Sequence, residues 1–580
     1  MKRTFTQHWV LPPSWLRFLV IILLVLGVFF RFANLGLKVY WHDETITSLH
    51  LAGYTGEDVR QQLFNGSVMG VKELLKYQFP TPETSFGDTL RTLIIEDPQH
   101  PPIYYLITRL WMHVFGNSVA VIRSVSALIS LFVFPCIYWV CIELFASSLV
   151  GWVAIALSAV SPVLLVFAQE ARGYSLLMVV ILLSSASLLR AMRVKTKGSW
   201  VIYAATLALG FYSLPLILLT AMGHGVYVVI VSLFSKAPPL LQENTLASKK
   251  LAIATDQSND DTLPSASLES EELAIANPPA SPLQASGFPW SKIITNYLLA
   301  SLTAFLAFTP WVLLTFNSLQ KAQASTAWSS TQVPLSRLVK SWAGNISRVF
   351  FDINLDATAP AIYTIPPVLI LLVLVSYSFY FLYRQTPINV YLFILTMIGI
   401  PFLALVLPDF VLGGLRSTVP RYLIPCFLGL LLTVAYLFSH KIFSSNSLNQ
   451  KLWLFLFAVV LSAEVVSCVV YSQSEVWWNK KPSDTHVQAA SLINQTNHPL
   501  VITSYYKTNL GELLSMSYLL NDNVKIQLVS EPSIPNIPKG FSDIFVLNPS
   551  QSLKFGIEKE YNYKVEPLTP SELQLWQLKR

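Results

Sequence analysis

The chain has 580 residues, of which 53% are hydrophobic and only 12% are Asp, Glu, Lys or Arg. Soluble domains carry about 25% charged residues, so this composition excludes a soluble protein, a disordered chain and a disulfide-rich secreted scaffold. The formal net charge is +7, but the basic residues are dispersed between apolar runs. That dispersal indicates orientation in a lipid bilayer and argues against nucleic acid as a partner.

Apolar stretches long enough to cross a bilayer recur along the chain and predict an all-α polytopic membrane protein of about eleven spans. The first, residues 18–35, follows a basic N-terminus and lacks a small-residue cleavage site, which predicts an uncleaved anchor. The pair within 200–234 can also be read as one long bent helix, which would change the parity of the count. The remaining spans are expected at about 120–142, 150–168, 174–190, 200–213, 215–234, 293–316, 361–383, 388–407, 422–439 and 452–472.

Basic residues between the spans alternate in density and predict the orientation, with the N-terminus in the cytoplasm and the C-terminal end outside. The turn near Glu143 is an exception to this pattern, because it carries no Lys or Arg. No organelle signal is visible in the sequence, so we expect the membrane to be a bacterial inner membrane. The short outer loops hold Arg172, Arg416 and Arg421. The short cytoplasmic segments hold Lys2, Arg3, Arg17, Arg190, Arg193, Lys195, Lys197, Arg384, Lys441 and Lys451.

Three longer polar stretches divide the chain into a membrane domain, 1–473, and an outer α/β domain, 474–580. Residues 36–119 form a first outer loop, in which 102–116 is expected to be an amphipathic surface helix. Residues 236–291 are rich in Ser, Pro, Asn and acids and predict a disordered cytoplasmic insert. In the outer domain the patterns predict helices at 485–495 and 509–520 and strands at 499–504, 524–529 and 543–548.

Adjacent carboxylates follow the first span in Trp41-His42-Asp43-Glu44. Two carboxylates beside an apolar boundary suppress each other's ionisation, so we expect one pKa to be raised toward the range of a general base. The alternative is that Asp43 caps the following helix and Glu44 complements its dipole, and the local sequence favours that alternative.

Three more clusters of polar residues are expected on the same outer side, and charged groups beside apolar runs are candidates for function. Pro98, Pro101 and Pro102 surround His100 and fix an extended start to the surface helix, which a purely structural role explains equally well. The planar guanidinium groups of the other two clusters suit phosphate. The clusters are Glu96-Asp97-Pro98-Gln99-His100-Pro101-Pro102 with Tyr104, then Gln169-Glu170-Ala171-Arg172-Gly173-Tyr174-Ser175, and Arg416 to Arg421-Tyr422.

Together these motifs match one family in their order along the chain. An acidic Asp-Glu pair is followed by D-x-x-H-P-P-x-Y-Y, F-G-x-S, R-S-x-S-A-L, S-P…Q-E-A-R-x-Y-S and a late R-Y-L-x-P. The chain resembles the membrane glycosyltransferases of the GT-C class, nearest family 39, the branch of protein O-mannosyltransferases and lipid A aminoarabinose transferases. The resemblance covers 36–195 and 400–430 best and says little about 236–291 or 474–580.

The resemblance implies transfer of a sugar from a polyprenyl-phosphate carrier to an acceptor hydroxyl at the outer face, with inversion. It makes Asp43 the general base and Glu44 its orienting partner, which reverses the preference for a helix cap. It implies that Arg172, and with less support Arg416 and Arg421, stabilise the departing phosphate. His42, Asp97, His100, Tyr104, Glu170, Tyr174 and Tyr422 complete the expected substrate-binding set.

His100 matches the protein mannosyltransferases, whereas the aminoarabinose branch tends to carry Lys there, which weakens the case for lipid A as the acceptor. Lipid, glycan and protein acceptors stay open. His42, Asp43, Glu96, Asp97 and His100 could supply ligands to a divalent metal, but a donor with one phosphate generally needs none in this branch, so we expect no cofactor.

Other functions remain as alternatives. An oligosaccharide ligase or polymerase would use a polyprenyl diphosphate and would need a larger cationic site. A lipid-linked sugar transporter would place ionisable residues near the bilayer midplane, where this chain has mainly Arg31 and Glu464. An intramembrane hydrolase lacks support because neither H-E-x-x-H nor G-x-S-x-G occurs.

Overall fold

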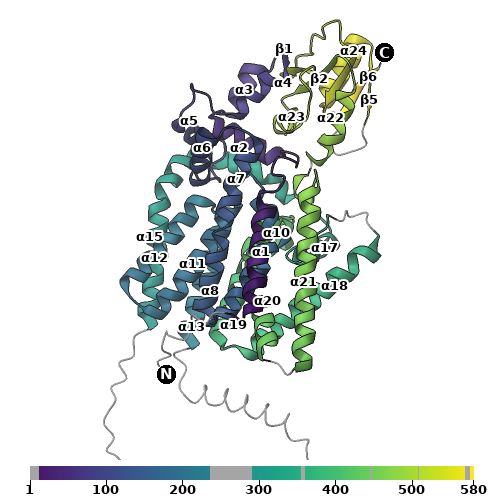
Figure 1. The fold of residues 1–580 in the computed structure, drawn as a ribbon. Helices are drawn as coiled ribbons and strands as arrows, with labels where there is room; N and C mark the ends of the chain where they lie inside the picture. Colours follow the sequence, from purple (N-terminus) through teal and green to yellow (C-terminus); the bar gives the residue numbers. More distant parts are fainter. Residues whose placement is uncertain are drawn as a thin grey trace, which may run out of the picture.

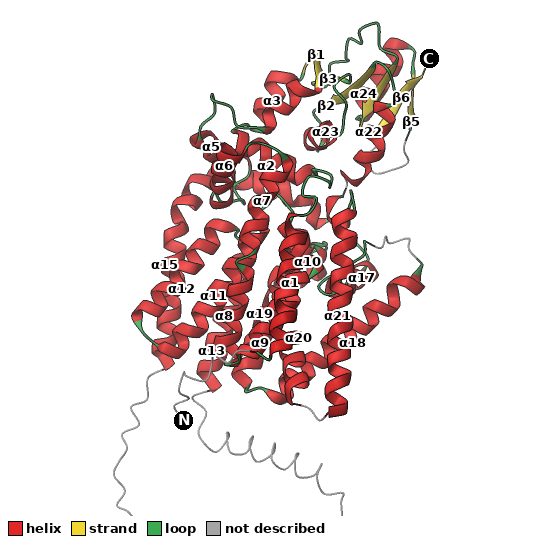
Figure 2. Cartoon of the chain, viewed as in Figure 1, coloured by secondary structure: helices red, strands yellow, loops and turns green. Residues whose placement is uncertain are grey.

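The computed structural model describes residues 12–234, 290–354, 360–444, 447–481, 483–506, 508–568 and 575–579. They form a long helical bundle with a smaller mixed domain at one end (Figure 1). The strands lie only in that smaller domain (Figure 2). The predicted fold class, an all-α membrane domain followed by a small α/β domain, is therefore confirmed. The predicted insert lies outside the described residues up to residue 289.

Each of the eleven predicted spans falls on a helix or a pair of helices, and the region 200–234 is two helices. Eight helices of the described chain are long and apolar enough to cross a membrane, or nine if the bent pair α9 and α10 is one span. The two helices of 200–234, α12 and α13, are shorter. The bundle consists of α1 (Ser14–Phe32), α7 (Val119–Ser130), α8 (Val133–Phe145), α9 (Ser148–Val160), α10 (Pro162–Ala168), α11 (Tyr174–Val194), α12 (Lys197–Ser213), α13 (Ile217–Phe234), α15 (Trp290–Thr315), α18 (Ala361–Gln385), α19 (Ile388–Val411), α20 (Ile424–Ser444) and α21 (Ser447–Gln473).

Helix α1 packs closely on the bent pair. Pro162 begins α10 and cannot continue the hydrogen bonds of α9, and the two helices meet at 61°. Gly27 allows the close approach, because a Cβ there would collide with the carbonyl of Ala159. Arg31 then donates hydrogen bonds to the carbonyl oxygens of Gly27 at 2.8 Å and Ala159 at 2.6 Å. The charge of Arg31 is thus used to join two helices.

Residues 36–119, the predicted first outer loop, fold into short helices at the end of the bundle beside the mixed domain, and the helix predicted at 102–116 is present as α6 (Figure 1). Helix α2 follows α1 directly, so the chain turns back over the end of the bundle at residues 33–41. The loop contains α2 (His42–Ala52), α3 (Gly56–Leu63), β1 (Asn65–Gly70), α4 (Val71–Leu75), η2 (Lys76–Gln78), α5 (Phe86–Glu96) and α6 (Ile103–Phe115). Between α15 and α18 lie η3 (Phe316–Ser318), α16 (Leu319–Thr326), η4 (Ala327–Ser330) and α17 (Leu335–Ser347), and η5 (Arg416–Thr418) and η6 (Pro420–Leu423) precede α20.

The outer domain holds a six-stranded sheet in the order β1-β3-β2-β4-β6-β5. Its central strands β3, β2 and β4 are parallel, and helix α23 connects β2 to β3 as a crossover. The predicted helices and strands of 474–580 are all present. The domain contains η7 (Trp478–Lys480), η8 (Ser483–Thr485), α22 (His486–Asn494), β2 (Pro499–Ser504), α23 (Asn509–Ser517), β3 (Lys525–Val529), β4 (Asp543–Leu547), α24 (Gln551–Tyr561), β5 (Lys564–Pro567) and β6 (Leu575–Lys579).

The edge strand β1 comes from the first outer loop, more than 400 residues away in sequence. It pairs antiparallel with β3, with Val68 opposite Gln527. The hydrophobic core under the sheet also combines both regions, because Leu49 of α2 and Val59 of α3 pack with Ile493 and Leu513. The first outer loop and the outer domain therefore share a sheet and a core.

Candidate active site

Asp43 lies in the first turn of α2, where residues 36–119 meet the end of the bundle nearest the mixed domain (Figure 1). Its side chain is 22% exposed, and its Oδ2 atom lies 3.6 Å from Nη1 of Arg421. Arg421 belongs to η6 at the start of α20, so α2 and a helix almost 400 residues later meet at this carboxylate. Asp43 makes no cap, because the N-cap residue of α2 is Trp41 and no side chain bonds there.

Arg172 connects Asp43 to the His100 motif. Its Nη1 donates to the hydroxyl of Thr47 at 2.8 Å and to the main-chain carbonyl of Asp43 at 3.3 Å. Its Nη2 donates to Nε2 of His100 at 2.7 Å. The guanidinium is thereby committed to holding α2 against the turn at 169–173.

His100 lies between Arg172 and a buried carboxylate. Its Nδ1 atom is 2.8 Å from Oδ1 of Asp97, whose Oδ2 is 3.7 Å from Nδ1 of His50. Because Arg172 can only donate, Nε2 of His100 must be free of a proton, and the ring proton belongs on Nδ1 facing Asp97. Burial together with Arg172 lowers the pKa of His100 despite the attraction of Asp97. The motif thus fixes a neutral imidazole in one tautomer.

Glu44 points away from Asp43 into a buried network. Arg123 donates to both of its carboxylate oxygens, at 2.8 and 2.7 Å, and Lys480 donates to Oε2 at 3.0 Å. The main-chain N–H of Ala171 donates to Oε1 at 2.8 Å. Glu44, Arg123 and Lys480 are essentially inaccessible to solvent. This geometry suits a residue that orients α2 and leaves no room for direct contact with substrate.

The expectation that one carboxylate of the Asp43-Glu44 pair has a raised pKa is wrong. Burial by itself would raise both, but Arg421 and Arg172 lower the pKa of Asp43, and Arg123 and Lys480 lower that of Glu44 to about 2. The two side chains face separate cations, so they do not suppress each other's ionisation. Asp43 is therefore held as a carboxylate.

Glu170 is the carboxylate of the cluster whose pKa is raised. It lies 3.8 Å from Lys480, and Asn479 donates to it at 3.5 Å. Its pKa is raised chiefly by burial, with Glu44 and Asp43 adding to the rise and Lys480 acting against it. Glu170 belongs to the network beneath Asp43.

Three tyrosines of the expected set line the arginines or the surface helix. Tyr174 lies under Arg172, whose Cζ is 5.9 Å from the ring centre, and Tyr422 lies 5.6 Å from Arg421. The hydroxyl of Tyr104 shares a hydrogen bond of 3.0 Å with Ser126 in the bundle. Tyr104 and Tyr174 are buried and Tyr422 is half-buried. At these distances the rings of Tyr174 and Tyr422 attract the neighbouring guanidinium groups through cation–π interactions.

Arg416 has its partners in α19, in the turn that follows α19 and in η4, and none of them is Asp43. Its Nη1 donates to Asp409 at 3.2 Å and to the carbonyl of Gly413 at 3.1 Å, and Nη2 donates to Ser330. The late arginines thus divide into Arg421 beside Asp43 and Arg416 bracing the loop before α20.

His42 faces the outer domain. Its Nδ1 atom lies 3.3 Å from Oε1 of Glu512 in α23, and its main-chain N–H donates to Ser483 at 3.1 Å. The ring is 23% exposed. The expected role of His42 in binding substrate therefore competes with a contact between domains.

Sequence reasoning missed three members of the site: Arg123, Lys480 and Glu512. Arg123 opens the R-S-x-S-A-L motif, and a lone Arg inside an apolar span is a signal that could have identified it. Lys480 and Glu512 carry no such signal, because each lies in an ordinary polar stretch of the outer domain.

The residues weighed as metal ligands are only partly together. Glu96, Asp97, His50 and His100 form a chain of side-chain contacts, with Oε2 of Glu96 3.3 Å from Nε2 of His50. His42 and Asp43 belong to other contacts. In the described part of the chain no group of three or more His, Cys, Asp or Glu is arranged to hold a metal ion.

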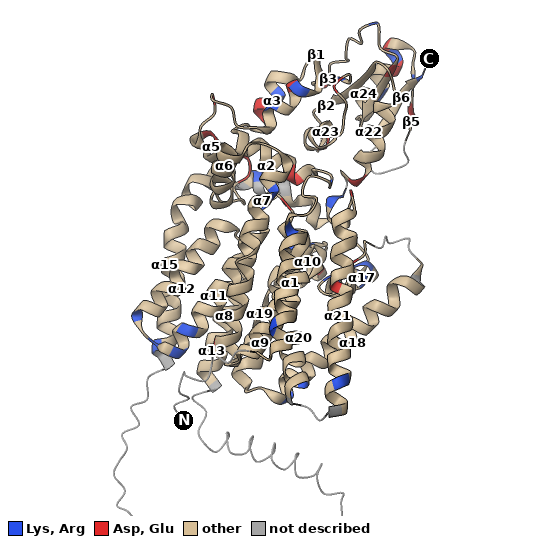
Figure 3. Ribbon diagram, viewed as in Figure 1, with Lys and Arg blue, Asp and Glu red and all other residues tan. Residues whose placement is uncertain are grey.

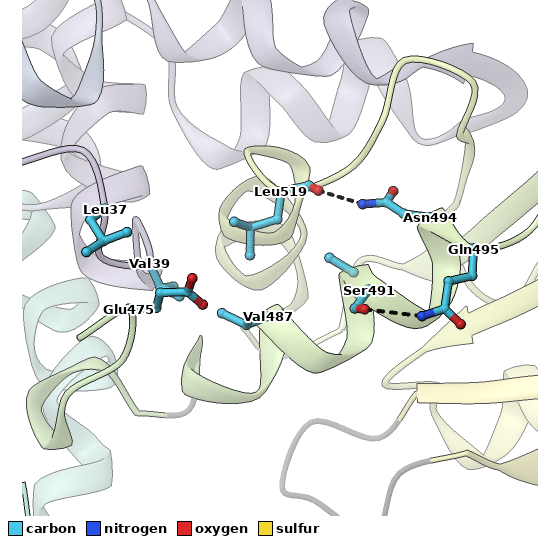
Figure 4. A pocket seen from close by; sticks show the side chains of 9 residues that line it. Leu37, Val39, Glu475, Val487, Ser491, Asn494, Gln495 and Leu519 are labelled. Atoms are coloured by element: carbon cyan, nitrogen blue, oxygen red, sulfur yellow. Dashed lines mark hydrogen bonds between the residues drawn. The ribbon is translucent and has the colours of Figure 1, made fainter. Parts of the chain in front are cut away.

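A pocket of about 440 Å³ opens on the side of the junction between the bundle and the outer domain (Figure 4). Leu37, Val39 and Glu475 line it from the membrane domain, and Val487 and Asn494 line it from α22. None of the residues predicted for the site lines this pocket.

Comparison with known proteins supports the resemblance. Residues 99–245 match the model of the family described as dolichyl-phosphate-mannose-protein mannosyltransferase, a segment that includes His100, Arg123, Glu170 and Arg172. No curated protein matches the chain.

Two of the solved structures that match the chain come from Cupriavidus metallidurans and Archaeoglobus fulgidus. ArnT from Cupriavidus metallidurans bound to undecaprenyl phosphate is 12% identical with a TM-score of 0.43, over 98% of this chain and 98% of that chain. The apo oligosaccharyltransferase from Archaeoglobus fulgidus is 11% identical with a TM-score of 0.45, over 90% of this chain and 65% of that chain. The match to the family model, on a helical membrane fold that carries the ordered motifs, confirms the resemblance: the chain is a multi-pass membrane protein that resembles the GT-C glycosyltransferases of family 39.

Proposed function

We propose that this protein transfers a glycosyl residue from a polyprenyl-phosphate-linked sugar to an acceptor hydroxyl at the outer face of the membrane, with inversion. The family model matched by residues 99–245 describes a dolichyl-phosphate-mannose-protein mannosyltransferase, an enzyme with this type of donor. We place the protein in a bacterial inner membrane. Protein, glycan and lipid hydroxyls all fit the proposal as acceptors.

The observation that carries the proposal is the environment of Asp43. The carboxylate is partly exposed, ionised, and 3.6 Å from the partly exposed Arg421, at the outer end of an apolar bundle. Asp43 is the carboxylate in its cluster that is open to solvent, since Glu44 and Glu170 are buried. An acceptor hydroxyl needs such a base, and a leaving phosphate needs such a cation beside it.

In the proposed reaction the acceptor hydroxyl gives its proton to Asp43 while its oxygen attacks the anomeric carbon. The bond from that carbon to the phosphate oxygen breaks on the opposite side, and its electron pair leaves with the phosphate. Inversion follows because the two oxygens lie on opposite faces of the sugar. Arg421 has the strongest support as the cation that stabilises the departing phosphate, since Arg172 and Arg416 are largely committed to protein partners.

The proposed orientation rests on the distribution of charge. Figure 3 shows Lys and Arg at the end of the bundle opposite the outer domain, whereas residues of both charges occur around α2 and in the outer domain. Glu143, in the turn that carries no basic residue, pairs there with Arg193 at 2.8 Å and Arg190 at 3.7 Å. These partners support a cytoplasmic location for that end and an outer location for the site.

The test is transfer from a panel of polyprenyl-phosphate sugars by the purified protein and by Asp43→Asn. We expect one donor to be turned over, with kcat reduced by about 100-fold or more in the variant because the general base is lost. Donor binding should persist in Asp43→Asn. Asp522→Asn, which removes an exposed carboxylate paired with Lys72, serves as the matched control and should transfer normally.

Three outcomes would contradict the proposal in different ways. Turnover that survives Asp43→Asn would place the base elsewhere. Turnover of diphosphate-linked oligosaccharides alone would favour an oligosaccharide ligase. Movement of lipid-linked sugar across vesicles, equal in wild type and Asp43→Asn and without transfer, would indicate a transporter.

A further inference from the structure

A carboxylate of the outer domain, Glu512, lies between two imidazoles, one of which, His42, begins helix α2. Glu512 of α23 places Oε1 3.3 Å from Nδ1 of His42 and Oε2 3.1 Å from Nε2 of His486. The Glu512 side chain is only 3% exposed. A buried carboxylate is costly unless it is paired, so these two rings and the hydrogen bond from Ser483 are what hold its charge.

Further hydrogen bonds join the first turn of α2 to the outer domain. The hydroxyl of Ser483 accepts from the main-chain N–H of His42 at 3.1 Å and donates to Oε2 of Glu512 at 2.9 Å. The hydroxyl of Thr45 donates to the carbonyl of Gly511 at 3.1 Å. Gly511 is needed for this approach, because a Cβ at that position would overlap the ring of His42.

The charges around His42 favour its protonated form. Burial lowers its pKa and Arg172 repels the proton, but Glu512 and then Asp43 outweigh both, so the pKa of His42 is raised above 6.5. The His42 and His486 contacts lower the pKa of Glu512 to about 2. The groups facing His42 are therefore Glu512 from α23, Asp43 from its own helix and Arg172 from the turn before α11.

We propose that Glu512 is a positioning residue for the site: it fixes the ring of His42 and so the first turn of α2, which carries Asp43. The role in transfer rests on the proposed function, whereas the contact between Glu512 and His42 does not. By this assignment the outer domain is a working part of the active site. A purely structural role would require only the shape of Glu512, which Gln preserves, while positioning through the His42 contact requires the charge.

The experiment measures the titration of His42 in the full-length protein in detergent. Diethyl pyrocarbonate modifies a histidine only when its imidazole is neutral, so the extent of modification at His42 against pH, read by mass spectrometry of its peptide, gives a midpoint. The variant Glu512→Gln removes the negative charge beside His42. The midpoint of His42 modification should therefore move to lower pH by about one unit, because the protonated ring loses a nearby opposite charge. His498, an exposed histidine of the same domain, provides an internal reference that should not move.

Two further variants guard against a folding defect. Glu512→Asp keeps the charge but withdraws it by one methylene, so its midpoint should lie between those of wild type and Glu512→Gln. Glu566→Gln removes an exposed carboxylate 3.0 Å from Lys579 and should leave the His42 midpoint unchanged. An unchanged midpoint in Glu512→Gln, in protein that elutes and melts like wild type, would overturn the proposal.

Turnover supplies a second readout. Glu512→Gln should lower kcat about tenfold with little change in KM for the donor, because a misplaced base slows chemistry more than binding. Glu512→Asp should recover part of the loss, and a Glu512→Gln protein as active as Glu566→Gln would refute positioning. If wild type transfers no sugar, the proposed function fails, and the His42 titration still decides the contact.

Discussion

The guanidinium of Arg172 donates to Nε2 of His100 at 2.7 Å, and this bond requires a neutral imidazole. His100 in turn holds its ring proton toward Asp97 at 2.8 Å, while Arg172 also binds Thr47 and the main chain of Asp43. The H-P-P motif is thereby connected to the acidic motif through one arginine. Protonation of His100 should consequently break its bond with Arg172 and so weaken the contact between Arg172 and α2.

The bond between Arg172 and His100 predicts a loss of stability in acid. The pKa of His100 is lowered below its ordinary value of 6.5, so the unfolded chain takes up the proton first as pH falls below about 6.5. The contribution of His100 to the free energy of unfolding is fully present above about pH 6.5, and it is lost as the pH falls from there through the lowered pKa of His100 in the folded protein. Melting temperatures between pH 8 and 5 should show the slope, and His100→Gln, which cannot titrate, should flatten it. Equal slopes in the two proteins would count against a neutral His100.

The network around Glu44 predicts a large effect on stability. Glu44→Gln leaves the buried Arg123 without a carboxylate partner and leaves Lys480 with only the more distant Glu170, which should cost about 3–5 kcal/mol of the free energy of unfolding. Asp522→Asn is the control, because Asp522 and its partner Lys72 are both well exposed, and it should cost about 1 kcal/mol or less. Thermal unfolding in detergent compares them, and equal losses would show that burial does not make Glu44 special.

The two late arginines predict different pH profiles. Arg421 is the largest of the charges that lower the pKa of Asp43, so Arg421→Gln should raise that pKa and move the acid limb of kcat/KM to higher pH. Arg416→Gln should leave the limb in place, because Arg416 pairs with Asp409. The profile of transfer against pH for both variants is the measurement. An equal shift in both would mean that Arg416 also acts on Asp43.

A pair of glycine substitutions tests the junction of α2 and α23 by sterics alone. In a helix, Gly→Ala ordinarily stabilises by about 1 kcal/mol. Gly344→Ala in α17, where an added methyl would meet nothing within 4 Å, should follow that rule. Gly511→Ala should instead destabilise by about 1–3 kcal/mol, because the methyl overlaps the ring of His42. Stabilisation by Gly511→Ala would mean that the His42 ring moves freely.

Much of the secondary structure follows from local sequence, because a helix or strand with one buried face repeats its hydrophobic residues at a characteristic spacing. Strand β2 occupies the predicted residues 499–504, and α6 falls within the predicted 102–116. The sequence predicted less well where spans bend or break, because bent and straight spans have similar length and hydropathy. The examples are the bend at Pro162 and the division of 200–234 into two helices. The expected rise in one pKa of the Asp43-Glu44 pair failed for a related reason: adjacency in sequence says nothing about which cations each side chain meets.

By itself the sequence determined a multi-pass helical protein, an outer α/β domain and an ordered set of motifs that includes Asp43 and Arg172. Hydrophobic length and period are properties of contiguous residues, so they can be read directly from the chain. Only the tertiary structure decided that β1 joins the distant β3, that Glu44 belongs to Arg123 and Lys480, and that Glu512 meets His42. These pairings join residues tens to hundreds of positions apart, and their free energy depends on burial and distance, which exist only once the chain has folded.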